Sequence, residues 1–297
     1  MVRQERLQRS LHAFVRRYWH VVEPGTPFQD NWHVHDVCTH LEAVARGQIR
    51  QLVINIPPRH MKSLLVSVFW PCWVWTWQPT LRWLFASYAA SLSFRDSGKC
   101  AQILQSDEWK EDWPQWCGLL KCAAGKIENN KLGYRLATSV GGATTGEGGD
   151  IVVVDDGLNA LEAFSEAERE KANMWLDQAM STRLNDPRTG RRVMVCQRLH
   201  EDDPAGHVLK ENTWDALIIR ARFEAKDTPS TSLGWKDPRT VEGALLWPER
   251  FGERELRDLE VKLGTYGTAG QLQQRPAPLD GGMLPRKWWK FWKVLPN

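Results

Sequence analysis

The chain of 297 residues exceeds the usual size of a single domain, which predicts one large core with appended parts or two domains. Hydrophobic residues make up 42% and charged residues 25%, as in an ordinary soluble protein. The net charge of +3 permits a nucleic-acid partner but does not argue for one.

Secretion and membrane insertion are both disfavoured. The first ten residues, MVRQERLQRS, are too highly charged for a signal peptide, and the six cysteines are scattered, so a reducing cytosol is expected. The very apolar segment 64–77 is short for a membrane span and contains Pro71, which favours a buried core helix. The sequence has 17 tryptophans, several at helical spacing, and we assign them to core packing rather than to base stacking.

In chain order, amphipathic segments alternate with short apolar runs. The segments predicted to be helical are 1–17, 31–47, 62–70, 89–105, 165–184 and 252–274. The segments predicted to be strands are 48–56, 82–88, 151–157, 191–200 and 214–223, with a hairpin at 126–140. Pro71 should end or kink the third helix, a break is expected at 264–268, and Ser165 with Glu168 predicts a capping box. The alternation predicts an α/β fold with a mostly parallel sheet.

A Lys-Ser pair, Lys62 and Ser63, lies between a predicted strand and a predicted helix in the stretch NIPPRHMKSLL. This is the context of a phosphate-binding loop, G-x-x-x-x-G-K-[ST], where free N–H groups of the helix N-terminus hold phosphates. Ile56 and Met61 occupy the positions of the two glycines, which normally permit close backbone approach. In this interpretation Lys62 reaches the β- and γ-phosphates and Ser63 places its hydroxyl on Mg²⁺. The alternative is an ordinary loop with an exposed lysine.

The apolar strand in DIVVVDD ends in Asp155 and Asp156, which is the form of a Walker B strand. Two adjacent carboxylates are unfavourable unless a cation neutralises them. We expect Asp155 to hold Mg²⁺ and Asp156 to position the attacking water. A strand-end turn is the alternative, because aspartate favours turns. Glu162 is a second candidate for the water-positioning acid if its loop folds back over the site.

A third apolar strand, in VMVCQRLHEDD, ends in Gln197 and Arg198. In many nucleotide motors a polar residue at the end of the neighbouring strand senses the γ-phosphate, and either side chain could do so here. The side chains from His200 to Asp203 could ligate a metal, but their crowding on one turn suits helix N-capping at least as well.

Four blocks of the sequence, in this order, resemble the large terminase subunit of tailed bacteriophages and span roughly residues 55–282. They are PPRHMKSLLVSVFWPCWVW, GEGGDIVVVDDGLNALEA, QRLHEDDPAGHVL and GQLQQRPAPLDGG. In that family a Pro-Pro-Arg-His segment before Lys-Ser is a known form of the phosphate-binding loop, so the resemblance implies a real site despite the missing glycines. The chain departs from the family at Gly157 and Leu158, where Pro and His are usual, and at Pro204, where Leu is usual. None of these departures removes a group assigned to chemistry.

The resemblance implies a P-loop NTPase of the RecA/ASCE-like class, with a mostly parallel sheet flanked by helices and a small C-terminal helical lid subdomain. The expected divisions are an N-terminal helical segment on the core at 1–48, the ATPase core at 49–222, the lid at 223–275 and a linker toward a nuclease domain at 276–297. The nuclease domain itself is absent from the chain, so no nuclease activity is expected.

The resemblance further implies an ATP-hydrolysing motor that moves double-stranded DNA into a procapsid, with ATP and Mg²⁺ as cofactors. Its expected partners are double-stranded viral DNA, the portal protein and the small terminase subunit, in the host cytoplasm and without a membrane. A homo-oligomeric ring is expected on the portal, from a chain that can be monomeric in solution. Two alternatives stay open: a helicase-like nucleic-acid translocase, and a nucleotide-binding module that docks on the portal without hydrolysis.

The site residues expected on this basis fall into three groups. The nucleotide-binding residues are Pro58, Arg59, His60, Met61, Lys62, Ser63, Leu64 and Gln197. The catalytic residues are Lys62, Asp156, Glu162, Arg59 and Arg198. The metal ligands are Ser63 and Asp155. Arg95 and Arg183 are further arginines that could neutralise transition-state charge, in this subunit or in a neighbour, with a surface salt bridge as the alternative.

Overall fold

The computed structural model of the chain describes residues 2–142, 146–227 and 229–277. Its centre is an eight-stranded sheet in the order β3-β4-β5-β2-β6-β7-β1-β8. The strands are β1 (Gln51–Asn55), β2 (Trp83–Ser87), β3 (Leu119–Ala123), β4 (Lys126–Asn129), β5 (Tyr134–Ser139), β6 (Ile151–Asp155), β7 (Arg191–Cys196) and β8 (Asp215–Ile218). All neighbours from β5 to β8 are parallel, while β3 and β4 are antiparallel.

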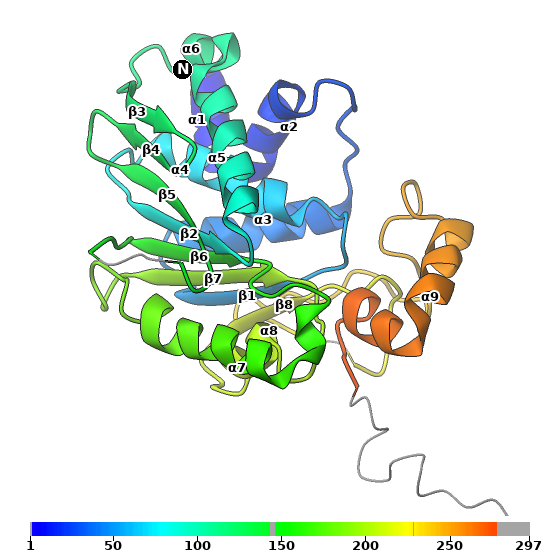
Figure 1. Cartoon of the computed structure of the whole chain (residues 1–297). Helices are drawn as coiled ribbons and strands as arrows, with labels where there is room; N and C mark the ends of the chain where they lie inside the picture. The colour runs from blue at the N-terminus through cyan, green and yellow to red at the C-terminus, as the bar shows by residue number, and fades with distance from the viewer. Residues whose placement is uncertain (1, 143–145, 228, 278–297) are drawn as a thin grey trace, which may run out of the picture.

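Helices cover both faces of this sheet (Figure 1). The α-helices are α1 (Val2–Arg9), α2 (Leu11–Val22), α3 (Trp32–Ala45), α4 (Trp70–Trp75), α5 (Ala90–Gln105), α6 (Asp107–Asp112), α7 (Glu166–Trp175), α8 (Pro204–Leu209) and α9 (Glu253–Gly267). Shorter π and 3₁₀ segments are η1 (Leu64–Phe69), η2 (Glu162–Phe164), η3 (Leu176–Met180) and η4 (Thr268–Leu272). In Figure 1, α3, α4 and α5 lie on one face and α7 and α8 on the other. The predicted α/β fold is confirmed.

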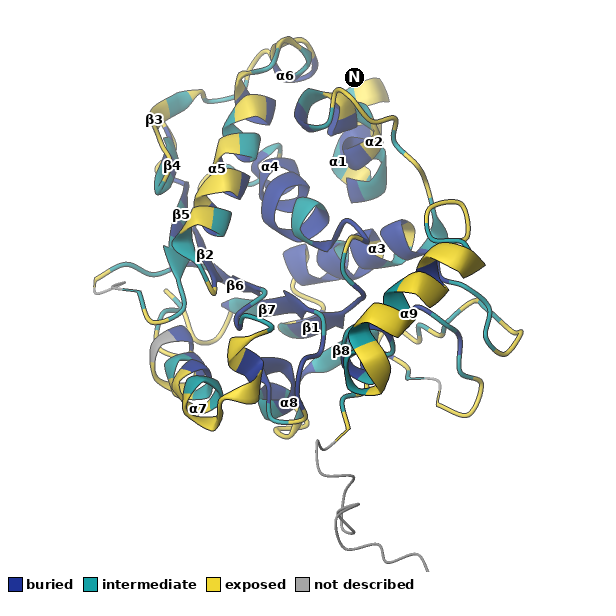
Figure 2. Cartoon of the chain, turned by 45° about the vertical axis from the view of Figure 1, so that its right-hand side comes forward, coloured by how far each residue is buried: buried dark blue, intermediate teal, exposed yellow. Residues whose placement is uncertain are grey.

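The alternation of side chains along each central strand builds two cores. In β6, Ile151 and Val153 join the larger core, and Val152 and Val154 join the smaller one on the opposite face. Every residue of α4 is buried, and all except Pro71 belong to the larger core; α4 is dark blue in Figure 2. The prediction of a buried core helix in this apolar segment is therefore confirmed for α4. No helix among the described residues has the length and apolar character needed to cross a membrane.

The sequence predicted that Pro71 would end or kink the third helix, but helical structure continues through Pro71. The π segment η1 leads directly into α4, and Pro71 lies in the first turn of α4. A proline has no N–H for the carbonyl four residues earlier, which here is that of Ser67. The Ser67 carbonyl instead accepts from Arg135 Nη2 at 3.1 Å and from Cys100 Sγ at 3.4 Å. Tertiary hydrogen bonds thus replace the one that Pro71 cannot donate.

Two helix-end predictions are met in different degrees. Ser165 caps α7 by accepting from the Glu168 N–H at 3.4 Å, but the Glu168 side chain contacts Lys171 instead of completing the capping box. The predicted break in the last helix is present, because Gly264 has φ of 65° inside α9. Figure 2 shows that α9 is largely exposed. The predicted linker lies outside the described residues, except for residues 276 and 277.

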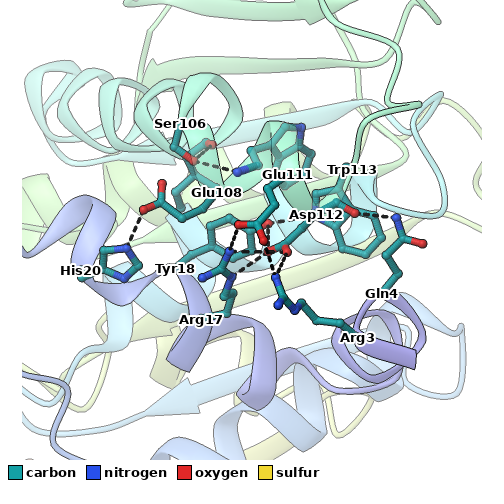
Figure 3. Close-up of polar contacts among 12 residues, drawn as sticks. Arg3, Gln4, Arg17, Tyr18, His20, Ser106, Glu108, Glu111, Asp112 and Trp113 are labelled. Carbon is teal, nitrogen blue, oxygen red and sulfur yellow. Dashed lines mark hydrogen bonds and ion pairs between the residues drawn. The ribbon is translucent and has the colours of Figure 1, made fainter. Parts of the chain in front are cut away.

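A polar network around Asp112 joins the N-terminal helices to the end of α6 (Figure 3). Arg17 Nε donates to Asp112 Oδ2 at 2.7 Å, Arg3 Nη1 to Oδ1 at 3.2 Å and the Tyr18 hydroxyl to Oδ2 at 3.0 Å. Burial raises the pKa of Asp112, but the hydrogen bonds from Arg17, Arg3 and Tyr18 outweigh it and hold the pKa below its ordinary value. The network fixes α2, whose Trp19 lines the cavity described below, as does Glu23, the residue that follows the helix.

We expect Asp112→Ala to lower the free energy of unfolding by about 3 kcal/mol, the lower end for breaking a buried ion pair, because Arg17 stays partly exposed. The folded-state pKa of Asp112 is depressed, so its stabilisation is present above the unfolded pKa of about 3.9 and is lost as pH falls through the folded pKa. Urea unfolding at pH 7 and pH 3 measures both effects. The control Glu111→Ala removes an exposed partner of the same arginines and should cost less than about 1 kcal/mol. Equal losses for the two variants would contradict this account.

Candidate nucleotide-binding site

Three parallel strands end at the same edge of the sheet. Strand β7 lies between β1 and β6 and pairs with both, in a register that places Asn55 beside Cys196 and Asp155 beside Val195. The loop after β1 therefore meets the acids at the end of β6 and Gln197 after β7. They surround a cavity of about 530 Å³, within the range of small-molecule sites.

Most of the predicted site residues line this cavity. They are Pro58, Arg59, Met61, Lys62, Ser63, Leu64, Asp155, Asp156 and Gln197. The structure thus brings together three sequence segments that were each predicted separately to contact a nucleotide.

The loop after β1, residues 56–61, reaches its curvature without glycine. Met61 stands where the second glycine is usual and has φ of 63°, and Arg59 has φ of 67°. Such a left-handed conformation is unfavourable by roughly 1–2 kcal/mol for a residue with a Cβ atom. The Met61 side chain is buried, which offsets part of this strain.

Lys62 joins the three segments. Its Nζ donates to Asp156 Oδ1 at 2.7 Å and to Gln197 Oε1. The Lys62 side chain is only 7% exposed, so these two acceptors offset the desolvation of its ammonium group. The predicted lysine, acid and amide therefore form one connected group.

Asp155 is held by two hydroxyl groups of the helix that follows the loop. Ser63 Oγ donates to Asp155 Oδ1 at 3.0 Å, and Ser67 Oγ to Oδ2 at 2.7 Å. Burial, together with the charges of Asp156 and Asp96, raises the pKa of Asp155 to about 7. The Asp155 carboxylate and the Ser63 hydroxyl are adjacent on this cavity, and hydroxyl and carboxylate oxygens are the ligands that Mg²⁺ prefers. The residues present therefore fit Mg²⁺ held by Ser63 and Asp155.

A buried arginine supports this arrangement. Arg135, which is fully buried, contacts the Ser67 carbonyl through Nη2 and Ser97 Oγ through Nη1 at 3.0 Å. Its guanidinium carbon lies 4.0 Å from the centre of the Phe85 ring. Arg135 thus holds the π turn from which Ser67 reaches Asp155. No sequence signal marked Arg135, because it lies in a hairpin strand without a recognisable motif.

The chain turns at once after β6. Asp156 has φ of 48°, its N–H donates to the Val195 carbonyl at 2.9 Å, and its own carbonyl accepts from the Tyr88 N–H at 2.9 Å. A straight strand would have pointed Asp155 and Asp156 to opposite faces. Asp156 itself adopts the left-handed conformation at this turn, and both acids line the same cavity.

Three predicted site residues are placed elsewhere. Glu162 is exposed in η2 and does not line the cavity. Arg198 is buried and its guanidinium is committed to Asp203, with Nε 2.9 Å from Oδ1. His60 is turned inward by the left-handed residues on either side, and its ring stacks on Phe251 with centroids 4.9 Å apart. Burial lowers the pKa of His60 to about 4.

The other side chains considered from sequence have structural partners. Arg95 lines the cavity but pairs with Asp96 at 2.8 Å. Arg183 is half-exposed and does not line it. The crowded segment from His200 to Asp203 matches the capping alternative, since Asp203 caps α8 by accepting from the Gly206 N–H at 2.7 Å.

Arg250 lines the cavity and was not predicted. It lies between β8 and α9, with its guanidinium carbon 5.1 Å from the centre of the Trp247 ring. The next residue, Phe251, stacks on His60 of the loop after β1 and so fixes its own segment beside that loop. Within the described residues Arg250 forms no ion pair. Arg250 could not be predicted as a site residue, because it is far in sequence from every motif and reaches the cavity only in the folded chain.

Comparison with known proteins gave matches to solved structures alone. No family model and no curated protein matches the chain. The crystal structure of the HK97 bacteriophage large terminase matches with 12% sequence identity and a TM-score of 0.51, covering 73% of this chain and 45% of that one. A mutant of the Thermus phage P74-26 large terminase ATPase domain matches with 13% identity and a TM-score of 0.43, covering 87% and 98%. The chain thus has the fold of the HK97 large terminase, over less than half the length of that protein.

Proposed function

We propose that this chain binds ATP and Mg²⁺ in the cavity and hydrolyses ATP as the motor of a phage DNA-packaging terminase. The observation that carries the proposal is the junction at Lys62, where the loop after β1, the acid after β6 and the amide after β7 meet. The fold shared with the HK97 large terminase supports the choice of motor. Double-stranded DNA, the portal protein, the small terminase subunit, a ring on the portal and the host cytoplasm belong to the same proposal.

The chemistry follows the general scheme of phosphoryl transfer, which depends on positioning and charge neutralisation. Mg²⁺, when bound, neutralises charge on the phosphates. Lys62 contacts the phosphates in place of one of its present acceptors, which frees the Asp156 carboxylate to orient water. Asp155 is the proposed metal ligand, and the hydrogen bond from Ser67 holds its carboxylate in position.

Arg59 and Arg250 are the arginines best placed to neutralise phosphate charge. Both line the cavity, both are exposed, and neither has an ion-pair partner among the described residues. Arg198 is not proposed for this role, because Asp203 already holds its guanidinium.

We expect Arg250→Ala to weaken ATP binding by roughly tenfold to a hundredfold, since a hydrogen bond to a charged group contributes about 1.5–3 kcal/mol. Fluorescence titration with a labelled ATP analogue and Mg²⁺ measures the dissociation constant. Arg254→Ala is the matched control: Arg254 is exposed on α9 and does not line the cavity, so binding should not change. Equal affinities for the wild type and Arg250→Ala would remove Arg250 from the site.

The motor is distinguished from its alternatives by two assays on the same preparation. We expect double-stranded DNA to stimulate ATP hydrolysis without separation of the strands of a forked duplex. Strand separation would instead favour the helicase-like translocase. Tight ATP binding without hydrolysis, even with DNA and portal protein added, would favour the non-hydrolysing docking module.

A further inference from the structure

Six arginines gather at the edge of the sheet opposite the nucleotide cavity, where the parallel strands begin. We call them the amino-edge cluster: Arg50, Arg82, Arg183, Arg188, Arg191 and Arg192.

Backbone hydrogen bonds show that the members of the cluster are neighbours. The carbonyl of Arg82 accepts from Asp150 at 2.8 Å, the carbonyl of Asp150 accepts from Arg191 at 3.0 Å, and Arg192 donates to the carbonyl of Arg50 at 2.8 Å. These residues begin β2, β6, β7 and β1, which are adjacent in the sheet, so the row is about 14 Å wide at the usual strand spacing.

The remaining two members lie in the segment that leads into β7. The Arg183 carbonyl accepts from the Gly149 N–H at 2.9 Å, just before β6. Arg188 follows Pro187, whose carbonyl accepts from Arg50 Nη2 at 2.5 Å. The backbones of the six residues are therefore neighbours along one edge of the sheet.

No member of the cluster forms an ion pair within the part of the chain that the structure describes. Three acids lie nearby, and none of them forms an ion pair with the cluster: Glu147 pairs with Lys126 at 3.6 Å. Asp150 accepts from the Arg82 N–H and from Asn185 Nδ2, and Asp186 accepts from the Arg188 N–H and from Thr189 Oγ1. Arg183 and Arg191 also keep buried N–H groups without a hydrogen-bond acceptor. Asp150 and Asp186 keep their negative charges, but the six arginines outnumber the nearby acids, so this edge carries a net positive charge.

The surroundings of the cluster indicate the kind of partner. None of the large apolar side chains found exposed among the described residues lies in 46–50, 82, 146–150 or 181–192. The cores of protein–protein interfaces are rich in aromatic and apolar side chains, whereas nucleic-acid interfaces are polar and strongly positive. Arginine also matches phosphate oxygens with two parallel hydrogen bonds.

We propose that the amino-edge cluster binds the phosphate backbone of double-stranded DNA, on the side of the sheet opposite the nucleotide cavity. The choice of DNA as the polyanion rests on the proposed function. The contact is independent of base sequence, because phosphates carry no sequence information.

The test compares two triple variants with the same change in net charge. Arg50→Gln, Arg82→Gln and Arg188→Gln together remove three exposed members of the cluster. The control triple, Arg6→Gln, Arg16→Gln and Arg254→Gln, removes three exposed arginines elsewhere. Fluorescence anisotropy with a labelled duplex of arbitrary sequence, without nucleotide, gives the binding constant over a range of salt concentrations.

The cluster triple should bind the duplex at least tenfold more weakly than the wild type. Its slope of log K against log salt should be less steep by about 2.7, since each lost phosphate contact changes the slope by about 0.9. The control triple should match the wild type within about twofold. Equal weakening in both triples, no weakening in the cluster triple, or no duplex binding by the wild type would each overturn the proposal.

The inference and the proposed function can fail separately. Duplex binding is measured without ATP, and ATP hydrolysis without DNA should be the same for the wild type and both triples. A chain that hydrolyses ATP but binds DNA no differently in the two triples would overturn the cluster alone. A chain that binds DNA as predicted but never hydrolyses ATP would overturn the proposed function alone.

Discussion

Lys62→Ala should abolish ATP turnover while the chain keeps its fold. The substitution removes the only positive charge that contacts both Asp156 and Gln197 in the described structure, and with it the group proposed to hold the phosphates. The fold should survive because Asp156 and Gln197 are partly exposed and can be solvated by water when Lys62 is absent. Steady-state phosphate release and thermal unfolding, measured on the same sample, check the two halves of the expectation.

The matched control for Lys62 is another lysine of the same cavity. Lys99 lines the cavity from α5 and pairs with Glu23, whereas Lys62 pairs with Asp156 at the end of β6. Lys99→Ala should retain turnover at saturating ATP. Normal turnover by a folded Lys62→Ala chain would show that this loop is not the phosphate-binding loop.

The second large effect concerns the acid that orients water. Asp156→Asn should leave ATP affinity nearly unchanged and lower kcat by roughly 10²–10⁴-fold, the usual loss for a general base. The reason is positional: the Asp156 carboxylate lines the cavity beside Lys62, whereas Glu162 is exposed outside it. Kinetics at saturating ATP, together with a binding titration, separate the effect on kcat from that on affinity.

Two further variants decide between the acids. Glu162→Gln should turn over normally, and Asp155→Asn should weaken binding that depends on Mg²⁺, because Asp155 is the proposed metal ligand. If Asp156→Asn turns over normally while Glu162→Gln binds ATP but is inactive, the role belongs to Glu162 and to a conformation in which its loop closes over the cavity.

Most of the sheet could be predicted from sequence because its central strands are short apolar runs that end in polar residues. The edge strand β3 could not, since its sequence LLKCA shows no alternation of apolar and polar residues and four of its five residues are exposed. In the helical segment that follows the loop after β1, the sequence predicted a helix end that the structure does not have. Pro71 indicated an end or a kink, and the predicted end is absent, because Arg135 and Cys100 supply the donors that Pro71 lacks and these contacts exist only after folding.

The candidate site likewise contains residues that the sequence predicted and residues that it did not. Lys62, Ser63, Asp155 and Gln197 were predictable because each lies at a strand or helix end, and parallel strands bring such ends to one edge. Arg250 was not, because it reaches the cavity through the packing of a distant segment against His60.

The same limit applies to residues that local sequence placed in the site. Arg198 directly follows Gln197, yet its side chain is drawn away by Asp203. A motif indicates which segments meet, whereas the direction of each side chain depends on tertiary partners.

The central claim, that this cavity hydrolyses ATP with Mg²⁺, is tested most directly by phosphate release from ATP in the presence of double-stranded DNA, with Mg²⁺ and then with excess chelator. The account predicts saturable release by the wild-type chain that stops when the chelator is added and is absent from Lys62→Ala. Release that persists without Mg²⁺ or in Lys62→Ala, or a wild-type chain that neither binds nor hydrolyses ATP under these conditions, would contradict it.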